Sequence, residues 1–426
     1  MLRPRWSVLV VSLALSAAAC RSSAGITVVE DDVVLAPSDR PDAPPIREDA
    51  APTDVVDMDA AAPTDVFVEM DAPAVVDAPT VTDARSDARA DARRDSGPAC
   101  VCPPLPTTCV TPARDTPAFS PERALLDQVM GVVACANTSL HLALYETLWD
   151  CLPNAILARL DAAPGLTVQI VVDDEDCPAS DGGAACPIRR LEGHPRVTLV
   201  ADNRSALMHH KFIVADNASV WVGSANSSQA SYCEDANDAV VIAEPAIVAA
   251  FEGEFQRMFR DRNFGPTTAG EPATGGIYTA HFSPRSPTTT AARWFTDMIA
   301  AINGARTSVD FVIASWTRDE LSTAMLAARA RGVRVRGIVA PNYINDAPAV
   351  ALRSAGVPVR VGAVHSKLLI IDDQTVITGS ANWSASAWSN NENSLWIRDA
   401  NIGTLYAGFF TREFERATVP LADRDR

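Results

Sequence analysis

Apolar residues recur along the chain with two different spacings. From about residue 118 onward, short runs of branched apolar residues, such as 167–172 and 333–339, alternate with longer stretches that are apolar every three or four positions, such as 246–259 and 404–414. The short runs predict buried strands, and the longer stretches predict amphipathic helices. Because strands and helices alternate, we expect an α/β fold.

The order of predicted elements occurs twice. Residues 136–144 match 305–313, each a turn that leads into a strand, and a helix and a second strand follow in both copies. The offset between the copies is 169 residues here but only 156 further on, so the first copy holds an insertion, which falls at 175–189. We therefore predict two similar α/β sandwich halves. Their bounds are 99–264 for the first half, 265–283 for a Gly/Pro/Thr-rich linker, and 284–426 for the second half.

A polar pattern, H-x-K-x4-D-x6-G-S-x-N, occurs once in each half without a gap. Residues two apart on a strand share a face, so each His points the same way as its Lys, and each Ser the same way as its Asn. The Asp falls on the opposite face, and we assign it, with the Gly, a structural role. The two copies consist of His209, Lys211, Asp216, Gly223, Ser224 and Asn226, and of His365, Lys367, Asp372, Gly379, Ser380 and Asn382.

Lysine occurs only in this pattern. The chain has 36 basic residues, and all except Lys211 and Lys367 are arginine. The two positions that keep lysine are expected to need a compact ammonium on a flexible stem rather than a planar fork.

The double pattern resembles the signature of the phospholipase D superfamily, over roughly residues 118–420. The resemblance implies that the halves meet across a pseudo-twofold axis and form one phosphodiesterase site, with no metal and no cofactor. One His attacks phosphorus and becomes phosphohistidine, and the other protonates the leaving oxygen. The Lys and Asn side chains hold the phosphate oxygens, and we also assign Ser224 and Ser380 to substrate binding. A nucleophile, an acid and paired cations suit phosphoryl transfer.

The resemblance leaves the roles of the two histidines open. Family members often carry a Glu or Asp beyond the Asn, where it accepts a hydrogen bond from the catalytic His. Glu392 occupies this position in the second half, but Asn237 occupies it in the first. By the habit of the family we assign His209 as the nucleophile and His365 as the acid, although Glu392 could equally make His365 the better oriented nucleophile.

The N-terminal region has the features of an exported protein. Residues 1–20 combine two arginines, an apolar run and small residues before Cys20, as in a secretory signal peptide. The small residues resemble a lipoprotein cleavage site, which implies lipidation of Cys20; simple cleavage after the alanines is the alternative. Residues 21–98, rich in Asp, Ala and Pro, are expected to form a disordered tether. The expected location is the outer membrane or cell surface, or otherwise the periplasm or the medium.

Eight further cysteines, an even number, all lie in the predicted first half, 99–264. A zinc site is the rival interpretation, but the spacing does not match that of zinc fingers, so disulfides in an oxidising compartment are the better interpretation. We predict one pair, Cys177 with Cys186, because both lie in the insertion.

Net charge bears on the substrate. The whole chain carries −17, and residues 21–98 alone hold 18 acidic and 7 basic residues, so the catalytic part is mildly acidic. A nuclease would favour a cationic groove along its polyanionic substrate. We therefore expect a monomeric phosphodiesterase of phospholipids, tethered to a membrane by its lipid anchor. The alternatives are a metal-independent nuclease of the same superfamily, a phosphatidyl transferase, and a lipid- or phosphate-binding protein with an inactive site.

Overall fold

A computed structural model describes residues 100–181, 184–268 and 272–420. The expected signal peptide at 1–20, the lipidation site Cys20 and the expected tether at 21–98 lie outside these residues. None of the helices in the described ranges is both long enough and apolar enough to cross a bilayer.

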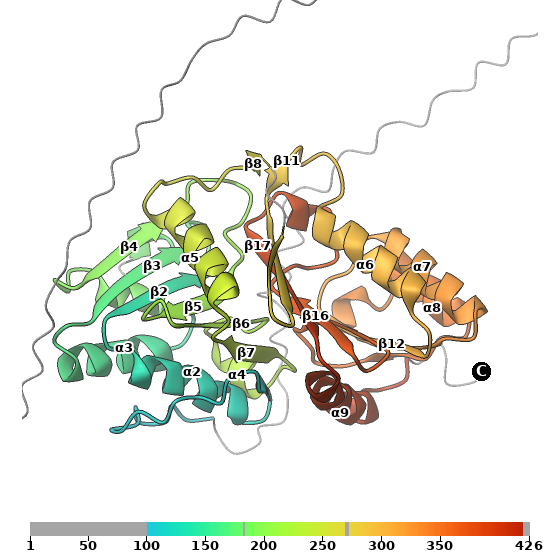
Figure 1. The fold of residues 1–426 in the computed structure, drawn as a ribbon, viewed down its shortest axis with the longest axis horizontal. Coiled ribbons are helices and arrows are strands. Elements are labelled where there is room, and N and C mark those ends of the chain that lie inside the picture. Colours follow the sequence, from blue (N-terminus) through green and yellow to red (C-terminus); the bar gives the residue numbers. More distant parts are fainter. Residues whose placement is uncertain (1–99, 182–183, 269–271, 421–426) are drawn as a thin grey trace, which may run out of the picture. The chain divides into compact units, whose positions relative to one another are not determined.

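The first half is built on a mixed sheet with the strand order β4-β3-β2-β5-β6-β7-β1 (Figure 1). Strands β2, β3 and β4 are parallel, and β5, β6, β7 and β1 continue the sheet with antiparallel pairs. The bounds are β1 (Pro117–Phe119), β2 (Ser139–Leu144), β3 (Thr167–Val172), β4 (Val197–Ala201), β5 (Lys211–Ala215), β6 (Ser219–Gly223) and β7 (Asp238–Ile242).

The second half repeats this sheet, with the order β14-β13-β12-β15-β16-β17-β10-β9. Strands β9 and β10 lie in the segment 265–283, which was predicted to be a linker. Because β10 pairs with β17 along its whole length, this part of the segment belongs to the second half. The bounds are β9 (Ala273–Gly275), β10 (Tyr278–Ser283), β12 (Ser308–Ile313), β13 (Arg334–Val339), β14 (Val359–Val361), β15 (Lys367–Ile371), β16 (Thr375–Gly379) and β17 (Glu392–Arg398); β8 (Thr267–Thr268) and β11 (Arg285–Ser286) form a separate small pair.

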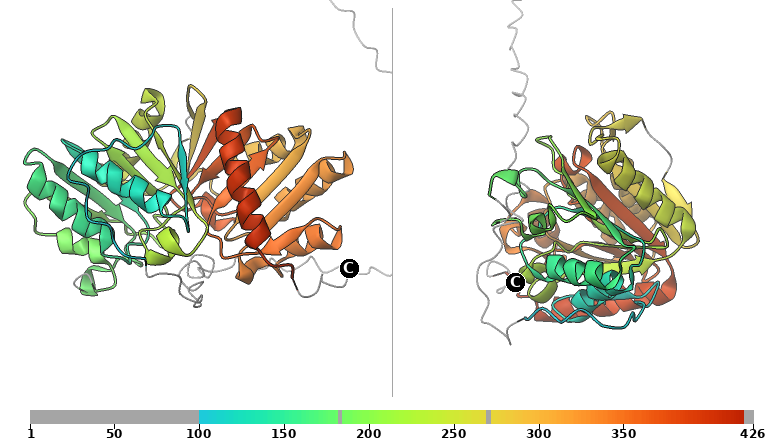
Figure 2. Two further views of the ribbon diagram at one scale, coloured as in Figure 1. Left: turned by 90° about the horizontal axis from the view of Figure 1, so that it is seen from below. Right: turned by 90° about the vertical axis from the view of Figure 1, so that its left-hand side faces the viewer.

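Helices pack against both sheets, and Figure 2 shows α9, in red, lying over the second sheet. Every residue of β5 and β15 is buried, which explains why the four residues after the initial lysine of each strand are all apolar. The predicted α/β fold with two similar halves is confirmed. The helices are α2 (Ala124–Cys135), α3 (Cys151–Ala162), α4 (Gln229–Cys233), α5 (Pro245–Phe259), α6 (Arg293–Gly304), α7 (Asp319–Ala330), α8 (Ala347–Ser354) and α9 (Ala400–Arg416).

One hydrophobic core contains residues of both halves, and a second lies within the first half. Phe119 of β1 stacks on Phe409 of α9 at 4.3 Å between ring centroids, and Phe251 of α5 meets Phe282 of β10 edge-on at 5.0 Å. Each of these two helices therefore also contacts a strand of the opposite half. Continuous packing of this kind resists relative movement, so groups from the two halves can form a site of fixed geometry.

All eight cysteines of the described ranges are paired. The predicted bond between Cys177 and Cys186 is present, and it closes a loop within the insertion. The other bonds tie the segment before β1 to the helices of the first half, and they exclude a zinc site made of these thiols. They are Cys100–Cys233, Cys102–Cys151 and Cys109–Cys135.

Candidate active site

Both motif histidines lie where the two halves meet. His209 precedes β5 by two residues, and its backbone N–H donates to the carbonyl of Asn391 in the second half at 3.0 Å. His365 occupies the same position before β15 and donates to the carbonyl of Ala236 in the first half at 2.9 Å. The backbone of each half thus fixes the motif segment of the other.

The side-chain partners of the histidines also come from the opposite half, and they differ chemically. Nδ1 of His209 lies 2.8 Å from Oε2 of Glu392. Nδ1 of His365 lies 3.1 Å from Oδ1 of Asn237 and 3.1 Å from the carbonyl oxygen of Ser224. The carboxylate, amide and carbonyl oxygens are acceptors and favour a proton on Nδ1 of both rings, whereas Nζ of Lys367, a donor, also lies 3.3 Å from Nδ1 of His365. The sequence-based alternative, in which Glu392 orients His365 of its own half, is wrong.

The two lysines extend beside their histidines. Nζ of Lys211 donates to the carbonyl oxygen of His209 at 2.9 Å, and Nζ of Lys367 donates to that of His365 at 2.8 Å. Nζ of Lys367 also lies 3.1 Å from Nε2 of His365. Both ammonium groups are buried, and in this low-dielectric setting they attract an anion far more strongly than at the surface.

The asparagines follow the motif strands β6 and β16. Nδ2 of Asn226 donates to Oε2 of Glu146 at 2.6 Å, and both side chains are buried. Glu146 was not predicted from the sequence. Its signal was its place two residues beyond β2, at the same edge of the sheet as His209. The carboxylate fixes the amide of Asn226, and Asn382 occupies the matching position in the second half.

The hydroxyls of Ser224 and Ser380, which were predicted to bind substrate, form hydrogen bonds within the protein. Both are fully buried, and each hydroxyl bonds to the protein: Ser224 Oγ lies 2.9 Å from Oδ1 of Asn237, and Ser380 Oγ accepts the backbone N–H of Asn393 at 2.9 Å. The serines therefore hold strands β7 and β17, and through Asn237 one of them supports His365.

The motif aspartates lie in turns, with φ of 54° for Asp216 and 56° for Asp372. Asp216 accepts backbone N–H groups from residues 137–139, and Asp372 accepts those from 306–308. Partial burial opposes ionisation, but these hydrogen bonds lower the pKa of both carboxyl groups. Each aspartate ties its motif hairpin to the strand beside it, away from the two motif histidines.

The motif glycines allow close approach of backbones. A Cβ at Gly223 would lie 2.1 Å from the carbonyl oxygen of Asp238, and one at Gly379 would lie 2.5 Å from that of Asn393. Gly379 also has φ of 129°, a conformation that other residues rarely adopt.

Behind the histidines, a second layer of polar contacts joins the halves. His210 is buried, and its Nδ1 lies 3.1 Å from Nδ2 of Asn393 while its Nε2 faces Glu254. In the second half Ser366 replaces this histidine, and its Oγ donates to Asp238 at 2.8 Å. Burial lowers the pKa of His210, which is consistent with a neutral ring donating from Nε2 to Glu254.

A family model described as "Cardiolipin synthase, PLD-like domain" matches residues 133–259 and 298–416, which together make up more than half of the chain. The chain belongs to the phospholipase D superfamily. The two matched segments coincide with the two halves and contain both copies of the motif.

Individual relatives of this phospholipase D superfamily member match over shorter stretches. Mitochondrial cardiolipin hydrolase of Mus musculus is 36% identical over 126 residues, which is 28% of this chain and 55% of that protein. Phospholipase D of Rickettsia conorii is 34% identical over 93 residues, 20% of this chain and 46% of that protein. The chain thus spans about half the length of the curated relatives it matches.

A solved structure reproduces the two-half fold. Phosphatidylserine synthase of Haemophilus influenzae superposes with a TM-score of 0.54 at 13% identity, over 72% of this chain and 87% of that one. At this level of identity the match establishes the fold alone.

Proposed function

We propose that the protein is a phospholipase D-type phosphodiesterase that cleaves phospholipids through a phosphohistidine on His209. The observation that supports this assignment is the carboxylate of Glu392 at 2.8 Å from Nδ1 of His209, where His365 has the neutral amide of Asn237. A phosphorylated imidazole bears positive charge that a buried carboxylate stabilises. His209 is therefore the better nucleophile.

Four groups perform the first step. Nε2 of His209 forms a bond to phosphorus while the bond from phosphorus to the leaving alcohol oxygen breaks, and His365, protonated on Nε2, donates its proton to that oxygen. Lys211 and Lys367 attract the phosphate oxygens, and Asn226 and Asn382 donate to them. In the second step His365 takes a proton from water, whose oxygen bonds to phosphorus and releases His209.

Phospholipid is the proposed substrate for two reasons. The catalytic part of the chain is mildly acidic, which disfavours a long polyanion. The similar proteins named above include a cardiolipin hydrolase and a phospholipase D. We further propose that the protein is exported, as the four disulfides favour an oxidising compartment.

The test is a direct comparison of substrates. Purified protein and its His209→Asn variant are incubated with anionic phospholipid vesicles and with single-stranded DNA. We expect the wild type to release the head-group alcohol and to leave DNA intact, and the variant to do neither. DNA cleavage without lipid cleavage would instead identify a nuclease, and binding of either substrate without turnover would identify a binding protein.

A further inference from the structure

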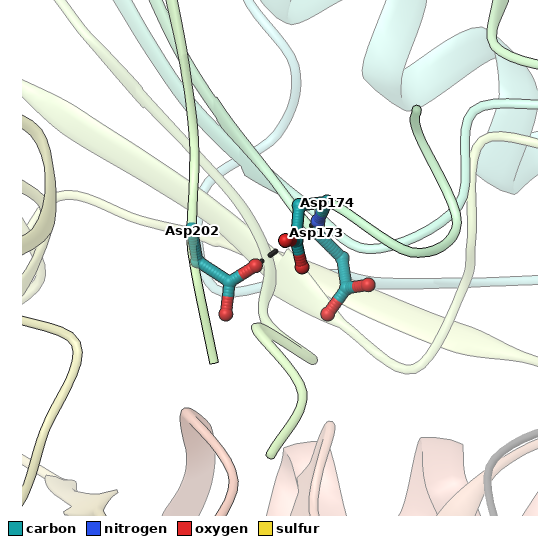
Figure 3. Close-up of side chains that lie close together, drawn as sticks. All are labelled: Asp173, Asp174 and Asp202. Carbon is teal, nitrogen blue, oxygen red and sulfur yellow. Dashed lines mark hydrogen bonds between the residues drawn. The ribbon is translucent and has the colours of Figure 1, made fainter. Parts of the chain in front are cut away.

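A cluster of carboxylates lies beside the catalytic segment but outside the motif. Asp173 and Asp174 follow β3, and Asp202 follows β4, the parallel neighbour of β3. Parallel strands end at the same edge of a sheet, and ligand oxygens of the three side chains lie within 4.8 Å of one another (Figure 3). Among the described residues, no motif residue belongs to such a cluster.

The cluster contains buried oxygens that the protein does not satisfy. Asp202 is only 4% exposed, and its Oδ1 accepts the backbone N–H of Asp174 at 3.0 Å. Its Oδ2 has no hydrogen-bond partner among the described residues, and neither does the buried Oδ1 of Asp174. Leaving a buried carboxylate oxygen without a partner is costly unless a cation binds it.

The fold does not require these acids, because the second half builds the same edge without them. In the register of β12, β13 and β14, Ala340 corresponds to Asp173 and Gly362 to Asp202. The backbone bond is retained, since the N–H of residue 202 donates to Val172 and that of residue 362 to Val339. The backbone geometry is therefore common to both halves, while the carboxylates occur in one.

We propose that Asp173, Asp174 and Asp202 form a binding site for one divalent cation of the oxygen-preferring class, Ca²⁺ or Mg²⁺. Three converging carboxylates and no nitrogen or sulfur ligand are typical of such ions. This proposal departs from the sequence-based expectation of no metal.

Asp173 links the carboxylate cluster to the segment that carries His209. Oδ2 of Asp173 accepts the backbone N–H of Met208 at 2.9 Å, and Met208 directly precedes His209. Oδ1 of Asp173 accepts the N–H groups of Glu175 and Asp176, at the start of the insertion. A bound cation would fix Asp173 and hence the segments that begin at Met208 and at Glu175. It would also offset the negative charge of the cluster near a bound phosphodiester. Cation binding itself does not depend on the proposed phospholipase activity.

The test measures binding and stability on the full chain after removal of ions by chelation. Calorimetric titration with Ca²⁺, and separately with Mg²⁺, should show one strong site for at least one of them. Asp202→Asn and Asp174→Asn should each weaken it at least about tenfold, since affinity follows the number of charged ligands. Asp161→Asn, which removes an exposed acid on α3, is the matched control and should bind as the wild type does.

Thermal unfolding separates loss of binding from loss of folding. Saturating cation should raise the melting temperature of the wild type and of Asp161→Asn by a few degrees, and leave Asp202→Asn unchanged. In chelator, Asp202→Asn should melt no lower than the wild type, because it removes a carboxylate oxygen without a partner. Lower melting of this variant in chelator would assign Asp202 a purely structural role and overturn the proposal.

Two further outcomes would also overturn it. The first is the absence of binding by either ion at millimolar concentration, and the second is binding that Asp202→Asn leaves unchanged. A shift with tetramethylammonium but not with Ca²⁺ or Mg²⁺ would assign the cluster to organic cations, contrary to the proposal.

Discussion

The two halves repeat one sheet and one motif, but they supply different groups to the shared site. The second half provides the carboxylate of Glu392 to His209, and the first half provides the amide of Asn237 to His365. Behind the histidines, His210 faces Asn393 and Glu254, whereas Ser366 faces Asp238. A duplicated fold therefore carries two unequal histidines, and this inequality permits a fixed division of labour between nucleophile and acid.

Among substitutions of the residues that contact the two histidines, we expect Glu392→Gln to lower turnover most. The amide keeps the size of the side chain but removes the charge that stabilises the imidazolium of His209, and it can favour the wrong tautomer. Turnover should fall on the order of 10²- to 10⁴-fold. The measurement is steady-state hydrolysis of phospholipid vesicles. A loss of less than threefold would show that the charge of Glu392 does not distinguish the two histidines.

Lys211→Arg and Lys367→Arg should each lower turnover by about 100-fold, although both keep the charge. The planar guanidinium group of arginine needs more room than the buried ammonium of lysine. It would therefore displace phosphorus from the attacking nitrogen. The same assay with matched Lys→Met variants separates charge from shape. Near-wild-type rates in both arginine variants would refute the argument from lysine usage.

Asn237→Asp should have a smaller effect, within about tenfold at neutral pH. It gives His365 a carboxylate partner like that of His209, and an adjacent negative charge favours the protonated ring. The alkaline limb of the pH–rate profile should therefore move to higher pH. An unchanged pH–rate profile would show that the residue at position 237 does not affect the pKa of His365.

Glu254→Gln should have the smallest effect on turnover and should act on stability instead. Burial opposes ionisation of Glu254, but hydrogen bonds from His210 and Arg257 lower its pKa to about 2. A depressed folded-state pKa contributes stability above the unfolded value of about 4.5, and this contribution is lost as the pH falls toward 2. At pH 7 the variant should lose about 3 kcal/mol.

Denaturant unfolding at several pH values measures this contribution. The difference between wild type and Glu254→Gln should shrink as the pH falls from 4.5 to 2. A difference that stays constant over this pH range would show that the ionised Glu254 carboxylate does not provide this stability.

Much of the fold followed from local sequence patterns. Alternating strands and helices, their duplication and the placement of the motif before buried strands are all encoded within short windows. Strand β10, of mixed polar and apolar residues, falls within the predicted linker, because only its pairing with β17 identifies it as a strand. Of the four disulfides only Cys177–Cys186 was predicted, since the other three join segments that tertiary folding brings together.

The site could be predicted as a set of residues but not as a set of contacts. The repeat identified His209, Lys211 and their counterparts, but it could not show that Glu392 crosses to the opposite half. Sequence spacing also suggested that the motif serines face substrate, whereas neighbouring strands bury them. Asp173 and Asp202 are separated by the insertion, so only the parallel pairing of β3 with β4 reveals their proximity.

The most direct test of the division of labour is to map the covalent intermediate. A slowly hydrolysed substrate is mixed with enzyme, the reaction is quenched under conditions that preserve phosphohistidine, and labelled peptides are sequenced by mass spectrometry. We predict label on His209 alone, no label in His209→Asn, and label still on His209 in His365→Asn when the substrate has a good leaving group. Label on His365 would contradict the assignment of the nucleophile.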